Sequence, residues 1–275
     1  MNAGPRHTID LHTHSTSSDG TNSPSELVGD AAAKKVELLA LTDHDTVAGV
    51  PEAAAACAAV GIRFIAGVEI STNADEHMHM LGLGIDHTNK KLADFLAHYR
   101  ANRTTRIKKM VAKLQAFGLE VSFEELPVTK GGSVGRAHLA DLLKAKGYAD
   151  TRQDAFRKYL IPGRPGYAEH QGPSITEAMD IIKEAGGRPV LAHPGVISSK
   201  WNFPAWTQSG LCGVEAFYSS HSESMTRILL DMADKYKLII TAGSDYHGPR
   251  SGREKNIGMS VSHENFLRIQ KGLGL

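Results

Sequence analysis

The sequence predicts an α/β protein, most simply a closed barrel of strands wrapped by helices. Short apolar runs typical of strands alternate with helical segments, which is the pattern of a parallel sheet covered on its outside. With 275 residues the chain is long enough for one large domain or for a barrel that carries an insertion. Most of the predicted strands end in histidine, aspartate or glutamate, and α/β barrels keep their chemistry at the carboxyl ends of their strands. We count seven such strands, which predicts an irregular barrel.

The first strands and helices follow from local signals. Ser23 is the N-cap of a helix that has Pro24 in its first position and Glu26 closing a capping box. An alanine-rich helix begins at Pro51 and is stopped by Gly61, a residue suited to the left-handed turn after a helix. The strands predicted in this part of the chain cover residues 6–9, 37–42, 63–68 and 78–81.

The alternation pauses after the fourth strand. Apolar residues spaced three and four apart predict a helix over residues 89–118, and no convincing strand pattern occurs from there to residue 171. We therefore expect a barrel made of residues 1–97 and 172–275, with residues 98–171 forming a small helical cap over its mouth. A capping box of Ser174 and Glu177 restarts the alternation, and the strands that follow cover residues 188–192, 213–217 and 237–242.

Composition and charge argue against several classes of protein. Hydrophobic residues make up 41% and charged residues 22% of the chain, as in an ordinary globular protein, and the net charge of +1 argues against a large basic surface that tracks nucleic acid. The first residues lack the apolar core of a signal peptide, and no apolar run could span a bilayer. Cys57 and Cys212 are best interpreted as free thiols in a reducing compartment. We expect a cytoplasmic protein with no membrane partner, and no obligate protein partner is evident.

The polar residues at the strand ends form a candidate metal centre. His12 and His14 lie two apart on an extended segment, so their imidazoles share a face. Alone, such a pair is as well explained by two surface or core histidines, but the later strands add further ligands. Six histidines and three carboxylates are too many for one tetrahedral ion. They favour two or three divalent ions, manganese first, with zinc, iron or magnesium as alternatives and calcium a poor fit. The set is His12, His14, Asp19, His44, Glu69, His79, His193, Asp245 and His247.

Clustered divalent ions suit one kind of reaction in particular. They bring the pKa of water down to about 7 and can hold both the attacking and the leaving oxygen of a displacement. Hydrolysis of a phosphoester is therefore the chemistry that we expect.

Five ordered motifs that span nearly the whole chain resemble those of the PHP family (polymerase and histidinol phosphatase). They are His12-x-His14, Thr42-Asp43-His44-Asp45, Gly67-Val68-Glu69, Ala192-His193-Pro194-Gly195 and Gly243-Ser244-Asp245-x-His247. The resemblance implies a distorted (β/α)7 barrel, similar to a TIM barrel, with a trinuclear metal centre.

The resemblance also implies how the ligands divide among three metals. The first metal would be held by His12, His14, Glu69 and Asp245. Glu69 would bridge to a second metal, which is shared with His79 and His193. Asp19, His44 and His247 would hold the third, and because many relatives carry histidine in place of Asp19, this third site is more acidic here.

Three stretches of the insertion are more particular: Gly135-Arg136-x-His138, Phe156-Arg157-Lys158-Tyr159-Leu160 and Pro162-Gly163-Arg164-Pro165-Gly166-Tyr167. They resemble the branch of the family that removes the 3′-phosphate from nucleoside 3′,5′-bisphosphates. Some members of that branch also trim short RNA or DNA from the 5′ end, so we expect a nucleotide or a short oligonucleotide as the substrate. A cationic cap is what a second phosphate requires, because arginine binds phosphate through two hydrogen bonds. The candidate substrate-binding residues are Arg136, His138, Arg157, Lys158, Arg164 and His221.

Alternatives remain for several of these assignments. Arg157 and Lys158 are also explained by a solvated helix face, and His221 by a neighbour of a helix cap. We assign catalysis to Asp245 and to His221, which would contact the scissile phosphate or protonate the leaving oxygen. Rival functions are a PHP phosphatase for another metabolite such as histidinol phosphate, a non-catalytic PHP module that scaffolds a polymerase, and a metal store or sensor.

Overall fold

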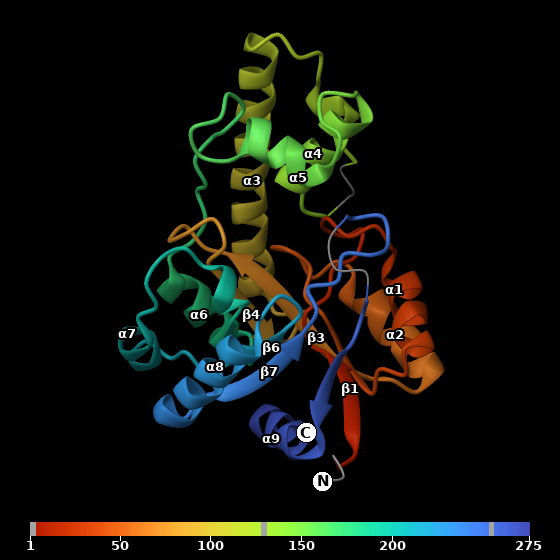
Figure 1. Cartoon of the computed structure of the whole chain (residues 1–275), viewed down its shortest axis with the longest axis vertical. Helices are drawn as coiled ribbons and strands as arrows, with labels where there is room; N and C mark the ends of the chain where they lie inside the picture. Colours follow the sequence, from red (N-terminus) through yellow and green to blue (C-terminus); the bar gives the residue numbers. More distant parts are fainter. Residues whose placement is uncertain (1–3, 128–130, 253–255) are drawn as a thin grey trace.

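The computed structural model of the chain describes residues 4–127, 131–252 and 256–275, and its centre is one mixed sheet that curls into a nearly closed barrel (Figure 1). The two edges of the sheet approach each other: the backbone N–H of Leu11, just after the first strand, donates at 2.9 Å to the carbonyl of Ala242, in an edge strand. In sheet order the strands are β7 (Ile239–Gly243), β6 (Gly213–Tyr218), β5 (Arg188–Leu191), β4 (His79–Leu83), β3 (Arg63–Ser71), β2 (Leu38–Leu41), β1 (Arg6–Asp10) and β8 (Met259–Ser262).

The strand count and the strand directions correct our prediction of seven parallel strands. β4 runs antiparallel to both β3 and β5, because the few residues that join β3 to β4 form a hairpin rather than a helical crossover. β8 also runs antiparallel, against β1. It escaped prediction because it has only four residues, two of them serine. The barrel itself is confirmed, with eight strands instead of seven.

Helices cover the outside of the barrel in groups (Figure 1). The predicted capping box is confirmed: the N–H of Glu26 donates to the hydroxyl of Ser23 at 3.2 Å, and the N–H of Ser23 donates to the Glu26 carboxylate at 2.8 Å. Gly61 ends its helix in the left-handed region, with φ 76°. The covering helices are α1 (Pro24–Ala33), α2 (Val50–Val60), α6 (Ile175–Glu184), α7 (Phe203–Gln208), α8 (Glu223–Tyr236) and α9 (His263–Leu273).

A single long helix joins the barrel to the cap above it (Figure 1). This helix, α3 (Lys90–Ala116), buries Leu92 and Leu96 in the core of the barrel. Its second half buries Ile107 and Met110 in a separate hydrophobic cluster, whose buried members lie between Ile107 and Ala168. The elements of the cap are η1 (Phe123–Glu125), α4 (Arg136–Ala145), α5 (Arg152–Ala155) and the π-helix η2 (Phe156–Leu160).

Polar contacts hold the cap over the mouth of the barrel. The guanidinium of Arg103, on α3, donates to Asp45 at 3.0 Å and to the hydroxyl of Ser71 at 2.8 Å. Just before α4, the backbone N–H of Ser133 donates to the carbonyl of Ser17 at 2.9 Å. No helix among the described residues is long and apolar enough to cross a membrane.

Candidate metal centre and substrate cavity

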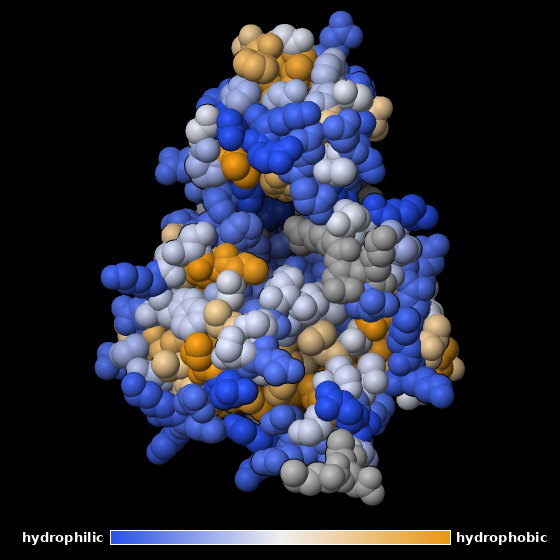
Figure 2. Space-filling model, in the orientation of Figure 1, coloured by the Kyte–Doolittle hydropathy of each residue, from blue (hydrophilic) through white to orange (hydrophobic). Residues whose placement is uncertain are grey.

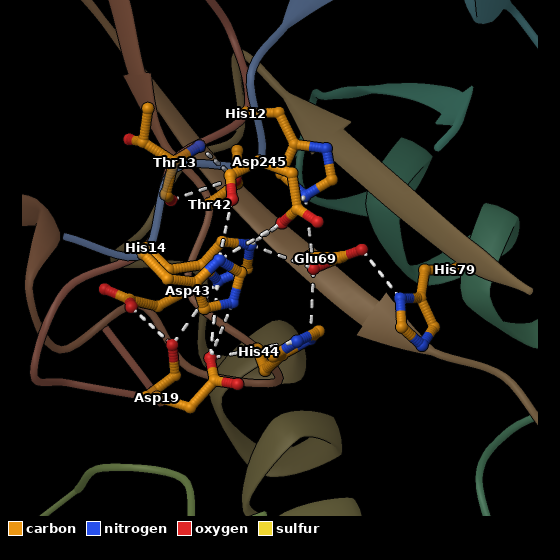
Figure 3. A network of polar contacts seen from close by, with 12 residues as sticks. His12, Thr13, His14, Asp19, Thr42, Asp43, His44, Glu69, His79 and Asp245 are labelled. Carbon is orange, nitrogen blue, oxygen red and sulfur yellow. Dashed lines mark hydrogen bonds and ion pairs between the residues drawn. The ribbon is translucent and has the colours of Figure 1, made fainter. Parts of the chain in front are cut away.

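The side chains predicted as ligands come from the strand ends and from the loops after them. At the end of β1, the backbone of Thr13 is held by Thr42, whose hydroxyl accepts from the Thr13 N–H at 3.1 Å. The hydroxyl of Thr13 donates to the carbonyl of Ala40 at 2.7 Å. With Thr13 tied to the neighbouring strand, His12 and His14 both point toward Glu69 (Figure 3).

Glu69, at the carboxyl end of β3, lies at the centre of the cluster (Figure 3). Its Oε2 is 3.2 Å from Nε2 of His12 and of His14, and 3.0 Å from Nδ1 of His44. Its Oε1 is 2.7 Å from Nδ1 of His79 and 3.0 Å from Nε2 of His193. Burial alone would raise the pKa of Glu69, but the imidazoles of His44, His12 and His79 hold it well below its usual range.

A second group of ligands surrounds Asp19, in the first loop. Nε2 of His247 lies 3.1 Å from Oδ1 of Asp19, and Nε2 of His44 and Nδ1 of His14 lie 3.9 Å from it. Asp245 joins the two groups, since its Oδ1 is 3.2 Å from Nε2 of His14. Three sets could each hold a metal ion: His14, Asp19, His44 and His247; His12, His14, Glu69 and Asp245; and His44, Glu69 and His79.

The positions of the nitrogen and oxygen atoms in this cluster are better explained by bound metal ions than by hydrogen bonds between the side chains. Among the described residues, Nε2 of His12 and of His14, Nδ1 of His44 and Oε2 of Glu69 are buried and make no hydrogen bond. The three nitrogens nevertheless lie 3.0–3.2 Å from Glu69 Oε2. Two ligands that each lie ~2.1 Å from one ion, at octahedral or tetrahedral angles, are roughly 3.0–3.4 Å apart. The spacing is that of ligands around shared ions.

Beside the metal centre lies a cavity of about 440 Å³ between the barrel and the cap. Figure 2 shows a hollow with hydrophilic walls at this level of the molecule. The volume falls within the range of about 300–1,000 Å³ that is usual for small-molecule sites. Asp19, His44 and His79 line the barrel side, and Arg103, Arg106 and Arg136 line the side of the cap.

Among the described residues, the three arginines form ion pairs with only two carboxylates. Glu76 pairs with Arg106 at 2.7 Å and with Arg136 at 2.8 Å, and Asp45 pairs with Arg103. Burial lowers the pKa of Arg136 to about 10, although the carboxylate of Glu76 opposes the shift, so Arg136 stays charged at pH 7. This wall of the cavity therefore carries surplus positive charge.

Two histidines of the same wall add no charge at neutral pH. Burial lowers the pKa of His77 to about 4. Burial, with repulsion from Arg103 and Arg106, lowers the pKa of His170 to about 3. The attraction for an anion therefore comes from the arginines.

The structure separates the predicted substrate-binding residues. Arg136 and Arg157 line the cavity, although Arg157 is 74% exposed and pairs with Asp154. Lys158 pairs with the same aspartate, outside the cavity lining. His138 accepts the N–H of Gly135 at the start of α4, at 3.0 Å. Arg164 is exposed in the loop after η2, away from the cavity.

Comparison with known proteins identifies the family. The profile of the PHP domain matches residues 10–161. The chain belongs to the PHP family. It is 39% identical over 271 residues to a 3′,5′-nucleoside bisphosphate phosphatase of Chromobacterium violaceum, covering 94% of this chain and 92% of the relative. It is 36% identical over 249 residues to a 5′-3′ exoribonuclease of Haemophilus influenzae, covering 87% and 90%.

A solved structure from Bifidobacterium adolescentis, assigned as that of a metal-dependent phosphoesterase, has the same fold. It superposes with a TM-score of 0.87 at 31% identity, over 98% of this chain and 97% of that one. The similarity to this structure thus covers nearly the whole chain, beyond residues 10–161 that the family profile matches.

His221 has a different environment in this PHP site from the one that we expected. Its Nδ1 lies 3.1 Å from the carbonyl of Ala216, and its Nε2 accepts the N–H of Gly195 at 3.0 Å. Burial lowers the pKa of His221. Both ring nitrogens of His221 therefore contact backbone groups, one of them in the turn after His193.

Sequence reasoning missed a buried carboxylate beneath the PHP ligands. Glu215, on β6, is fully buried, and both its oxygens lie 3.2 Å from Nδ1 of His12. It also accepts the backbone N–H of His193 at 2.8 Å. A partner on one ring nitrogen leaves the other nitrogen of a histidine for the metal. The signal was present, since an acidic residue interrupts an apolar strand run at Glu215.

Local backbone strain also marks the PHP site. Asp245 and His193 adopt positive φ angles of 57° and 29°. Non-glycine residues in this region are uncommon and persist where surrounding contacts hold them, often at functional sites. For His193 those contacts are the Glu215 carboxylate and the turn that His221 holds.

Proposed function

We propose that this chain removes the 3′-phosphate from nucleoside 3′,5′-bisphosphates and also trims short oligonucleotides from their 5′ ends. The chain is a hydrolase of phosphate esters of the PHP family, with relatives named as a bisphosphate phosphatase and as exoribonucleases. The observation that carries the narrower proposal is the row of Arg103, Arg106 and Arg136 beside the candidate metal centre. A substrate with two phosphates could place one phosphate at the metal centre and the other at these arginines.

The candidate centre takes divalent ions, and we propose two or three, with manganese as the preferred metal. His12, His14, Glu69 and Asp245 would hold one ion, and His14, Asp19, His44 and His247 another. His79 and His193, with Glu69, would complete the third position. When bound, such ions lower the pKa of water and stabilise the negative charge that develops on the phosphoryl group.

The residues of the chain have separate tasks in this proposal. Arg136 and Arg106, held in place by Glu76, bind the phosphate that is not cleaved. Arg103 orients the cap through Asp45 and Ser71 and adds charge to the same wall. His221 keeps the Gly195 turn in place and so supports His193, instead of acting as the acid that the sequence suggested.

A substrate panel tests this function. Adenosine 3′,5′-bisphosphate, a short 5′-phosphorylated oligonucleotide and histidinol phosphate are each offered with manganese, zinc and magnesium. We expect turnover of the bisphosphate, with release of the 3′-phosphate and fastest with manganese. Preferential hydrolysis of histidinol phosphate would overturn the proposal, and so would no hydrolysis of any substrate with any metal, which would favour a scaffold or a metal store.

A further inference from the structure

One arginine of the cavity wall differs from the three that face the metal centre. Arg152, the first residue of α5, is only 5% exposed and lines the cavity. Its Nη1 is buried and finds no hydrogen-bond partner among the residues that the structure describes. Leaving a buried charged donor unsatisfied is costly, so such an atom points to a partner that the protein itself does not supply.

The other two nitrogens of Arg152 each have a partner. Nε donates to Oδ1 of Asp141 at 2.7 Å, and Nη2 donates to Oδ2 of the same carboxylate. This two-bond contact between α5 and α4 holds the guanidinium plane in one orientation. It also balances the charge of Arg152, unlike the arginine wall beside the metal centre, where two arginines share Glu76. A free N–H on a charge-balanced group suits a neutral acceptor better than a second phosphate.

Apolar side chains line the same cavity as Arg152. Phe156 follows four residues later, so the two side chains project from the same face of the helix, and both line the cavity. Phe156 begins the π-helix η2, a rare local geometry that is frequent at functional sites. The other apolar residues that line this cavity are Ile107, Val134, Ala137 and Ile161. A flat ring with hydrogen-bond acceptors on its edge matches such a wall.

We propose that Arg152 and the apolar wall around Phe156 form a nucleobase subsite, in which Nη1 of Arg152 donates to a ring acceptor of the base. This inference rests on the proposed function, because it deepens the recognition of a nucleotide in the same cavity. It places the base beside Arg152 and Phe156 and the cleaved phosphate at the metal centre. The uncleaved phosphate lies between them at Arg136, whose guanidinium is 5.5 Å from the centre of the Phe156 ring.

A pair of ligands that differ only in the base tests the subsite by equilibrium binding. AMP and ribose 5-phosphate are titrated into the metal-loaded protein, and the ratio of their affinities measures the contribution of the base. We expect AMP to bind more tightly, and Arg152→Lys to reduce its affinity roughly 10- to 100-fold, the value of one charge-assisted hydrogen bond. Lysine keeps a cation beside Asp141 but lacks the second donor group, so the affinity for ribose 5-phosphate should stay unchanged.

A matched variant separates recognition from support of the helix. Thr151 caps α5 by accepting the N–H of Asp154 at 3.0 Å, and it does not line the cavity. Thr151→Ala should loosen α5 and lower the melting temperature while the affinity ratio stays that of the wild type. If Thr151→Ala lowers the ratio as much as Arg152→Lys does, Arg152 only pins α5 to α4 and the subsite is refuted.

Failure of the subsite and failure of the proposed function are distinguishable. Equal affinity of the wild type for AMP and ribose 5-phosphate overturns the subsite, even if adenosine 3′,5′-bisphosphate is hydrolysed. An affinity ratio that depends on Arg152 supports the subsite, even if the reaction proves to be a different phosphoester cleavage.

Discussion

Replacing Glu215 with glutamine should weaken metal binding without removing any residue of the candidate metal sets. Glu215 accepts from Nδ1 of His12 and from the backbone N–H of His193, and both contacts are buried. Glutamine has the same shape but only one acceptor oxygen, so its amide group must face one of the two donors. Because both oxygens of Glu215 lie 3.2 Å from Nδ1 of His12, the NH2 of glutamine faces this nitrogen in either orientation, and the N–H of His12 loses one acceptor oxygen and the negative charge of its partner.

The size of the effect follows from the hydrogen bond that the substitution removes. A hydrogen bond to a charged group contributes about 1.5–3 kcal/mol. Removing the partner that orients a metal-binding histidine typically costs about 10- to 100-fold in metal affinity, or roughly 1.4–2.7 kcal/mol. The two magnitudes agree, so we expect Glu215→Gln to bind manganese about 10- to 100-fold more weakly.

Competition with a chelator measures this affinity directly, independently of turnover. The matched control is Glu37→Gln, because Glu37 contacts Nδ1 of His7 with both oxygens at 3.0 Å, as Glu215 contacts His12, but on the surface. Metal affinity in this control should equal that of the wild type. An unchanged affinity in Glu215→Gln, or an equal reduction in both variants, would refute the reasoning.

Three further predictions follow from the site. Arg136→Ala should reduce kcat/KM for adenosine 3′,5′-bisphosphate roughly 10- to 100-fold more than kcat/KM for an aryl phosphate, because the variant loses one charged hydrogen bond to the second phosphate. Equal reductions for the two substrates would exclude Arg136 from substrate recognition. His12→Ala should lower the metal content, measured by elemental analysis, while the circular dichroism spectrum stays native. A variant with full metal content and activity would contradict the metal centre. A chelator should likewise abolish wild-type activity, and added manganese should restore it. His170 has a folded pKa of about 3, below the ordinary 6.5, so it contributes stability above pH 6.5 that is lost as the pH falls toward 3. In urea unfolding, the free energy of unfolding of the wild type should therefore be up to about 2 kcal/mol lower at pH 5 than at pH 7.5. This difference should be absent in His170→Gln, and an identical pH dependence in the variant would exclude His170 as the cause.

The part of the fold that could be predicted depends on contacts between near neighbours in the chain. The capping boxes of Ser23 and Ser174, and the C-cap at Gly61, are decided by residues within one turn of each helix end. The antiparallel direction of β4 was not predicted and β8 was missed altogether, because their pairing with β5 and with β1 joins residues far apart in the chain. The apolar spacing of three and four likewise predicted α3, although its division between two hydrophobic clusters was invisible in the sequence.

The sequence by itself determined the chemical types of the site. Histidine and carboxylate at successive strand ends indicate metal ligands, because the carboxyl ends of barrel strands converge wherever the barrel closes. Which donor atoms face one another was decided by the tertiary structure, which placed Glu69 between five imidazoles and Glu215 beneath His12.

The cavity could be found only in the folded chain. No local pattern singled out Arg103 and Arg106 within the long predicted helix, or Arg152 within the insertion. Arg103, Arg106 and Arg152 line one cavity because α3 carries the cap over the mouth of the barrel, which brings α5 and the strand ends to the same space. The tertiary structure also brings both ring nitrogens of His221 into contact with backbone groups, which no local sequence pattern predicts.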